Sequence, residues 1–179
     1  MLNDKLIIGL GGAGNNIISY IQEKIISNYN FLLIQTDENS YRDSIIKNKI
    51  LLDLKNNSNI EDAFNIYITN IQKYFKSFNK VFIIAGLGGI CGSKVLGYLG
   101  ATCMKYDCIS HAVVTIPFHY EGKLRSKVAN ETIDKSKKNF SHFKIFENQS
   151  IYAKANKDTT FIQAFDILNE SIYEYVRNT

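Results

Sequence analysis

The sequence has little of what secreted, membrane-spanning or multidomain proteins need. Its single proline, Pro117, excludes a proline-rich linker, and no run of about 18 apolar residues is present to form a membrane-spanning helix. The cysteines Cys91, Cys103 and Cys108 are odd in number and lack metal-ligand spacing, so neither a disulfide framework nor a metal site is predicted. The cysteine content therefore indicates a reducing, cytoplasmic location, and no membrane insertion is expected.

An excess of charge of one sign is also missing. The chain has 21 lysines and arginines against 17 aspartates and glutamates, a formal net charge of +4. The densest basic run, Lys135 to Lys138, follows two acidic residues by one turn of an expected helix, and no aromatic residues interleave with it. This pattern does not favour nucleic-acid binding. The length of 179 residues suits one domain, residues 1–179, with its own core.

What the sequence does have is a regular alternation of strand-like and helix-like segments. Nearly continuous runs of Val, Ile, Leu and Phe predict strands at Lys5–Leu10, Phe31–Thr36, Lys49–Leu52, Lys80–Ala85, Ser110–Ile116 and Phe143–Phe146. Apolar residues from Ile60 to Phe75 repeat at helical spacing, with Ser58 or Asn59 available as the N-cap. The alternation predicts a Rossmann-like α/β domain of three layers, a mostly parallel sheet with helices on both faces.

Two glycine-rich segments follow predicted strands. Gly9–Asn16 (GLGGAGNN) follows the first strand, and Ala85–Ser93 (AGLGGICGS) follows the fourth. Ligands of such folds bind at the carboxyl ends of the strands, where glycines let backbone N–H groups approach a phosphate. One such segment is weak evidence, because a tight strand-to-helix turn needs some of the same glycines. Two at one edge of a sheet predict a polyphosphate site, and the order Ser93-Lys94 excludes a Walker P-loop.

Several segments in order along the chain resemble the tubulin and FtsZ superfamily, and FtsZ more closely than tubulin. The two glycine segments are similar to its nucleotide loops, the second of which is usually GGGTGTG. Thr36-Asp37 resembles the TDxxxL element, and Val114–Arg125 (VTIPFHYEGKLR) resembles VTxPFxFEGxxR. Phe165 and Asn169 fall on a helix similar to the family's central helix. The resemblance covers essentially the whole chain and implies the tubulin/FtsZ nucleotide-binding domain, with GTP or GDP as its ligand.

The resemblance also implies which residues bind the nucleotide. Those expected around the phosphates are Gly11, Gly12, Ala13, Asn15, Gly88, Gly89, Ile90, Cys91, Gly92 and Ser93. Glu121 and Arg125 would hold the ribose and the base edge; without the resemblance, a surface ion pair between residues four apart is the simpler interpretation. Asn148 would touch the ribose or the base. Phe165 would stack on the purine, and Asn169 would read its edge.

Some residues depart from the family pattern. Ile90, Cys91 and Lys94 stand where the family has Gly, Thr and Gly, so we expect added bulk, a lost hydroxyl and a cation near the phosphates. The segment Asp53–Ser58 is short and lacks the family's glycines, which leaves contacts to the terminal phosphate open. Glu170 stands where Asp is more usual.

In tubulin and FtsZ, a loop after the central helix carries acidic residues that act on the neighbouring subunit's nucleotide, and a second domain follows. This sequence stops at Thr179, so no catalytic residue is predicted, and hydrolysis is expected only if a partner supplies that loop. An apolar stripe from Phe161 to Val176 lies opposite Glu170 and Glu174, which predicts an outer face suited to water. That pattern favours a naturally single-domain relative over a truncated fragment.

The sequence therefore predicts an FtsZ-like guanine-nucleotide-binding protein, acting as a cell-division or cytoskeletal filament regulator or capping subunit. The expected partner is a full-length FtsZ-type protein or a second copy of the chain. The alternative is a nucleotide-free interaction module that retains the fold, which Ile90, Cys91 and the short third loop favour. An NAD-linked oxidoreductase is disfavoured, because it leaves the second glycine segment unexplained and offers only Asp37 as a ribose-binding acid.

Overall fold

The computed structural model describes residues 5–25, 28–57, 59–106, 108–154 and 160–179. Within them the strands form one parallel sheet in the order β3-β2-β1-β4-β5-β6. The strands are β1 Lys5–Leu10, β2 Tyr29–Gln35, β3 Lys49–Leu51, β4 Lys80–Gly86, β5 Ile109–Ile116 and β6 His142–Glu147. Every predicted strand is confirmed, with ends that differ by at most two residues.

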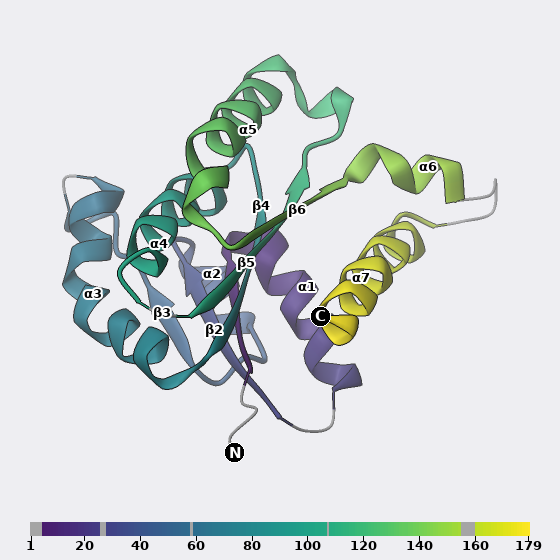
Figure 1. Cartoon of the computed structure of the whole chain (residues 1–179). Helices are drawn as coiled ribbons and strands as arrows, with labels where there is room; N and C mark the ends of the chain where they lie inside the picture. The colour runs from purple at the N-terminus through teal and green to yellow at the C-terminus, as the bar shows by residue number, and fades with distance from the viewer. Residues whose placement is uncertain (1–4, 26–27, 58, 107, 155–159) are drawn as a thin grey trace.

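Helices cover both faces of this sheet (Figure 1). They are α1 Gly11–Lys24, α2 Glu38–Asp43, α3 Ile60–Ser77, α4 Leu96–Cys103, α5 Lys123–Ser136, α6 Ile151–Lys154 and α7 Phe161–Asn178. Figure 1 shows α3, α4 and α5 on one side of the sheet and α1 and α7 on the other. The predicted three-layer, Rossmann-like α/β fold is therefore confirmed. None of the described helices combines the length and the hydropathy that crossing a bilayer requires.

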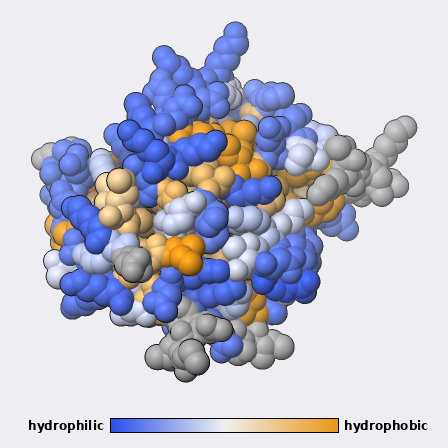
Figure 2. Space-filling model, in the orientation of Figure 1, coloured by the Kyte–Doolittle hydropathy of each residue, from blue (hydrophilic) through white to orange (hydrophobic). Residues whose placement is uncertain are grey.

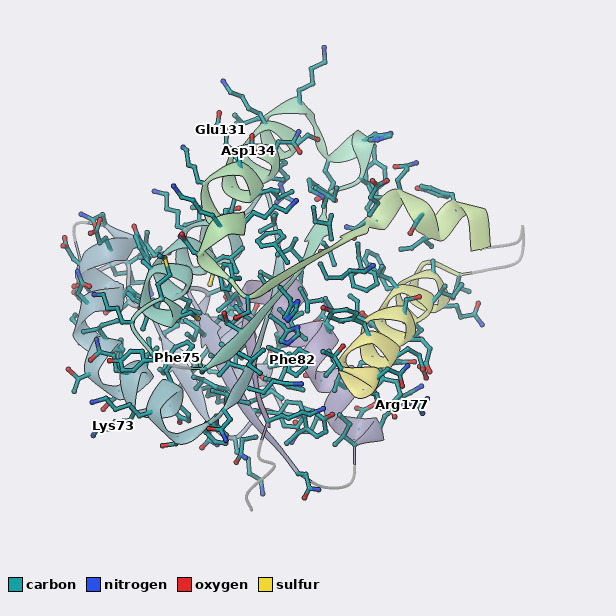
Figure 3. The ribbon with its side chains drawn as sticks, viewed as in Figure 1. Lys73, Phe75, Phe82, Glu131, Asp134 and Arg177 are labelled. Carbon is teal, nitrogen blue, oxygen red and sulfur yellow. The ribbon has the colours of Figure 1, made fainter. Side chains whose placement is uncertain are left out.

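The surface in Figure 2 is mostly hydrophilic, with an apolar area between α5 and β6. Below it, successive residues of the strands point to opposite faces, as the two-residue period of a strand requires. On β4, Ile83 packs with Phe75 of α3 in one core, and Phe82 packs with Ile18 and Ile172 of the α1 and α7 side in the other. Figure 3 labels Phe75 and Phe82, one from each core. The central strands β1, β2, β4 and β5 lie between these two cores and are largely buried on both faces.

The helix α3 begins where the sequence places it. The side chain of Asn59 accepts hydrogen bonds from the backbone N–H groups of Glu61 and Asp62, at 2.9 and 3.0 Å. Asn59 is therefore the N-cap, and the two acidic residues also suit the positive end of the helix dipole. The other candidate cap, residue 58, lies outside the described residues.

The helix α7 starts with a reciprocal cap between Thr160 and Gln163, in which each side chain accepts from the other residue's backbone N–H. Its apolar stripe is buried at Leu168, Ile172 and Val176, as predicted. The side chain of residue 161, also assigned to that stripe, lies outside the described side chains. The stripe fixes α7 against the sheet, next to α1.

The sequence predicts that the polar face of α7 is exposed to water, but part of this face contacts α1. The Glu170 carboxylate accepts a hydrogen bond from the Tyr20 hydroxyl of α1 at 2.6 Å, and it also pairs with Lys24. These contacts hold the pKa of Glu170 below its usual value, with the hydrogen bond from Lys24 as the largest cause and that from Tyr20 as the next. Glu170 therefore links α7 to the C-terminal half of α1.

Candidate functional site

The two glycine segments lie side by side at the carboxyl edge of the sheet. The strands β1 and β4 are neighbours, with Leu10 opposite Ala85, so the chain leaves both strands at the same level. A methyl group built on Gly11 would lie 3.2 Å from the Cβ of Cys91, which shows how closely the segments approach. The predicted meeting of the two segments at one edge is confirmed.

A cavity of about 520 Å³ opens between these segments. It is lined by Leu10, Gly11, Gly12, Ala13, Gln35, Thr36, Gly86, Leu87, Gly88, Gly89, Ile90, Cys91, Gly92, Thr115, Pro117, Glu121, Arg125 and Asn148. Most of the residues assigned to a nucleotide by resemblance are among them. The sequence assignment did not include Gln35, Thr36, Thr115 or Pro117, although the last three fall inside or beside segments that carry the resemblance.

Some glycines in these segments are required by the packing of the chain itself. A Cβ on Gly92 would lie 2.1 Å from the carbonyl oxygen of Gly86. Gly88 has a φ of +92°, and a Cβ there would lie 2.9 Å from the carbonyl oxygen of Arg125. Larger residues at these two positions would clash or be strained.

Two other glycines have no such internal requirement. A Cβ on Gly12 or Gly89 would meet nothing within 4 Å, and neither has a positive φ. Both residues line the cavity, and Gly12 lies in the first turn of α1, whose backbone N–H groups have no acceptor within the helix. Glycine at these positions suits the close approach of a ligand to the backbone, and a helix N-terminus favours an anionic one.

A second cavity, of about 680 Å³, lies between α1 and α7 and continues the first. The two share Ala13, Thr115, Glu121 and Asn148 as lining residues. Its other lining residues are Asn16, Ile17, Ser19, Tyr20, Glu23, Phe165, Asp166, Leu168 and Asn169. The structure thus brings Phe165 and Asn169 together, one turn apart, at the end of the cleft away from the glycines.

The second cavity combines an aromatic ring with several polar side chains that lack partners. The ring of Phe165 packs edge-on against Phe118, with 5.8 Å between ring centroids. Within the described part of the chain, no hydrogen bond engages the side chains of Asn16, Asp166 or Asn169, which all line the cavity. The Oδ1 atom of Asn148 is buried and also has no partner there. Unpaired polar groups around an aromatic ring can hold a flat heterocycle.

Glu121 lies at the junction of the two cavities, and Arg125 lines the first one. The Arg125 guanidinium donates to Glu121 at 2.5 Å, and the other oxygen of Glu121 accepts from the Phe118 backbone N–H at 2.8 Å. The pair is thus the ion pair that spacing alone predicts. It also lines the cleft, so both interpretations describe the same two side chains.

The departures in the second glycine segment have different structural consequences from those expected. The thiol of Cys91 donates to the Ile34 carbonyl at 3.4 Å, and burial raises its pKa to about 12, so it remains protonated and directed at the sheet. The Ser93 hydroxyl accepts from the Gly88 N–H at 2.9 Å and so shapes the segment. Lys94 is exposed and is not among the lining residues, so the expected cation is not placed in the cavity.

Asn16 lies in the cleft, whereas Asn15, the residue that the resemblance assigns to the nucleotide, does not. Asn15 accepts a hydrogen bond from the Ser44 hydroxyl at 2.6 Å and lines neither cavity. Asn16 lines the second cavity instead. The signal that would have found it is helical spacing, because Asn16 lies four residues after Gly12 and therefore on the same face of α1.

The third loop lies next to the first cavity rather than in it. Asp53 accepts hydrogen bonds from the Asn56 side chain and from the backbone N–H groups of Lys55 and Asn56. These bonds lower the pKa of the Asp53 carboxyl, and the bond from the Asn56 side chain is the largest cause. Asp53 lines a small cavity of about 230 Å³ that shares Thr36 with the first one. The loop thus borders the end of the cleft farthest from Asn169.

Comparison with known proteins identifies the family. Residues 5–156 match the family model described as the Tubulin/FtsZ family, GTPase domain. The chain belongs to the tubulin/FtsZ family. Among similar curated proteins, the cell division protein FtsZ of Rickettsia felis is 27% identical over 180 residues, which cover 96% of this chain and 40% of the relative. FtsZ of Caulobacter vibrioides is 24% identical, with 97% and 36% covered.

Solved structures of FtsZ and CetZ proteins have the same fold as this tubulin/FtsZ-family chain. An empty FtsZ dimer from M. jannaschii superimposes with a TM-score of 0.83 at 27% identity, over 97% of this chain and 53% of that one. A GTPγS-bound protofilament of CetZ2 from Haloferax volcanii gives 0.80 at 16% identity, over 97% and 57%. The chain spans about 40% of the length of the Rickettsia FtsZ proteins that it matches.

Proposed function

We propose that this tubulin/FtsZ-family domain binds a guanine nucleotide, GTP or GDP, in the continuous cleft along the carboxyl edge of the sheet. The observation that carries the proposal is the pair of glycines, Gly12 and Gly89, which face open space from opposite segments without any internal requirement for glycine. A phosphate chain between them would receive hydrogen bonds from backbone N–H groups. Family membership supports the same ligand.

The order of the strands gives the ligand a direction. The cavity with Phe165 and Asn169 lies between α1 and α7 and includes Asn148, which directly follows β6. The glycine segments follow β4 and β1, and Thr36 follows β2. A nucleotide would therefore place its base beside α7, its ribose near Glu121, and its phosphates toward β1 and β2.

Purified protein tests the proposal directly. We expect denaturation and chromatography to release GDP or GTP, and calorimetry of the stripped protein to show binding of both. The glycine variants described in the Discussion then assign that binding to the cleft. A stripped protein that binds neither nucleotide, but still binds an FtsZ-type protein, would contradict the proposal and favour the nucleotide-free interaction module.

We further propose that the nucleotide-loaded domain acts on a cell-division or cytoskeletal filament, as a regulator or capping subunit. Ile90 lines the cleft and is 60% exposed, and Leu124, beside the lining residue Arg125, is 75% exposed. Large apolar side chains at the mouth of a cleft suit a protein partner. The similar proteins described as an FtsZ dimer and a CetZ2 protofilament suggest which kind. Polymerisation of a full-length FtsZ-type protein in its presence is the test.

Hydrolysis is proposed only with residues supplied by that partner. The acid at the junction of the cavities, Glu121, is already held by Arg125 and by the Phe118 N–H, which suits binding better than the activation of water. We place the domain in a reducing cytoplasm, since the buried cysteines Cys91 and Cys103 form no disulfide within the described residues.

A further inference from the structure

Two of the cysteines meet at the turn between α4 and β5. Cys103 is the last residue of α4, and Cys108 directly precedes β5. The backbone N–H of Tyr106 donates to the Cys103 carbonyl at 3.1 Å, and the N–H of Cys108 donates to the Tyr106 carbonyl at 2.9 Å. Two tight turns in succession reverse the direction of the chain. Cys108 is therefore brought back beside the end of the helix that the chain has just left.

The side chains of these two cysteines contact each other. Their thiols share a hydrogen bond, and this bond, followed by burial, raises the pKa of the Cys103 thiol. Cys103 is buried in the core that contains Phe75, whereas Cys108 packs against that core and is partly exposed. The thiol of Cys91 instead donates to the Ile34 carbonyl. The fold thus pairs two thiols, one inside the core and one that solvent reaches.

We propose that Cys103 and Cys108 form a reversible disulfide by exchange with a small-molecule disulfide, oxidised glutathione, so that the α4–β5 turn is a redox-responsive modification site. Cys108 reacts first, because solvent reaches it. Its thiol loses a proton to water, and the thiolate attacks one glutathione sulfur and releases the other glutathione as a thiolate. The Cys103 thiol then loses its proton, attacks the Cys108 sulfur and displaces the second glutathione. Two electrons pass from the cysteines to glutathione, and the two glutathione thiolates take up the two protons.

The position of the pair separates this modification from nucleotide binding. The turn lies at the amino edge of the sheet, where β5 begins, whereas the candidate cleft lies at the carboxyl edge. In a reducing cytoplasm the pair stays a dithiol, and a rise in oxidised glutathione converts it to the disulfide, which joins the end of α4 to the start of β5. Disulfide formation is independent of the proposed nucleotide binding, so a domain that binds no nucleotide still tests it.

Glutathione exchange on the intact chain is the test. The protein is equilibrated with mixtures of reduced and oxidised glutathione, alkylated in denaturant, digested with trypsin and analysed by mass spectrometry. Trypsin cleaves after Lys105, so the disulfide would join residues 95–105 to residues 106–123. We expect this joined peptide, with the buried Cys91 alkylated as the internal control. The equilibrium constant for closing the disulfide should be at least about tenfold larger in the folded protein than in urea, because the fold already holds the thiols together.

Single-cysteine variants separate the two steps of the exchange. Cys103→Ala removes the second thiol, so we expect one glutathione to remain attached to Cys108. Cys108→Ala keeps only the buried thiol of the pair, which should take up glutathione at least about tenfold more slowly. A folded wild-type protein that carries glutathione on both cysteines, or in which neither reacts, would overturn the proposal. So would a joined peptide that forms no more readily in the folded protein than in urea.

Discussion

At the scale of single residues, the glycines of the two segments separate into those that the chain needs and those that only a ligand needs. Gly92 belongs to the first kind, since any side chain would collide with the carbonyl of Gly86. Gly12 belongs to the second, since it lies within α1, has open space around it and lacks a positive φ. Glycine inside a helix costs about 0.5–1 kcal/mol relative to alanine. The free protein is therefore less stable with glycine at position 12 than it would be with alanine. This cost points to a requirement imposed by binding.

Substitution at Gly12 should move stability and binding in opposite directions. We expect Gly12→Ala to raise the free energy of unfolding of the nucleotide-free protein by about 0.5 kcal/mol. The added methyl group would occupy the space of a bound phosphate, so GTP affinity should fall at least about tenfold. Chemical denaturation and calorimetry measure the two effects.

Gly92→Ala is the comparison, because its Cβ would collide with backbone that cannot move aside. We expect it to destabilise the fold by about 3 kcal/mol or more. If Gly12→Ala binds GTP as tightly as the wild type, the phosphate is not held at this turn.

At the scale of secondary-structure elements, the sequence predicts the strands well because the central ones, β1, β2, β4 and β5, are mostly apolar runs whose residues are largely buried. It also predicts the start of α3, because Asn59 stands directly before the apolar repeat. It does not predict side-chain directions where helices begin irregularly. Cys91–Val95 form a π-helical turn, so the place of Lys94 next to Ser93 in the sequence does not bring its side chain into the cavity.

The assignment of Asn15 rather than Asn16 to the nucleotide has a similar cause. The glycine segment reads as a loop, but α1 already begins at Gly11, directly after the last residue of β1. Once that start is known, helical spacing puts Asn16 on the face of Gly12. The first residue of a helix decides which side chains enter a site, and glycine-rich sequence leaves that residue undefined.

The packing of α7 on the sheet also depends on a histidine that the sequence does not single out. His111 on β5 is buried, stacks against Phe82 and His142, and its Nδ1 lies 3.3 Å from the Tyr175 hydroxyl of α7. Burial, as the largest cause, together with the nearby His142, Lys80 and Lys5, lowers the pKa of His111 to about 4. Its Nε2 atom is buried without a partner among the described residues.

This histidine should make the fold sensitive to mild acid. Because its pKa is lower in the folded protein than the usual 6.5, the unfolded chain takes up the proton first, and stability falls as the pH drops from about 6.5 toward 4. Between pH 7 and pH 5 we expect a loss of about 2 kcal/mol from this group. Denaturant unfolding at the two pH values measures it.

His111→Phe keeps the stacking on Phe82 and removes the titration. We expect this variant to lose much less stability between pH 7 and pH 5 than the wild type, whereas His119→Phe, at an exposed histidine, should behave as the wild type does. The same acid sensitivity in His111→Phe would show that another group is responsible.

At the scale of the whole molecule, the cleft, its apolar rim and the family relationship point to the same surface. The rim residues Ile90 and Leu124 come from the second glycine segment and from the first turn of α5, which meet where Gly88 packs against Arg125. A partner seated on both would also cover the phosphate end of the cleft. Nucleotide and partner would then stabilise each other's binding, since each orders the same segment.

A filament assay decides whether this surface caps an FtsZ-type polymer. At a small molar fraction, the GTP-loaded domain should lower the amount of polymer that a full-length FtsZ-type protein forms with GTP, because a bound end cannot extend. The double variant Ile90→Lys, Leu124→Lys should lose this effect while its GTP affinity changes by less than about threefold, because both side chains are solvent-exposed. Pelleting and electron microscopy measure polymer mass and length. If polymer formation is unaffected by the wild-type domain, or is lowered equally by the double variant, the capping role is wrong and the rim has another use.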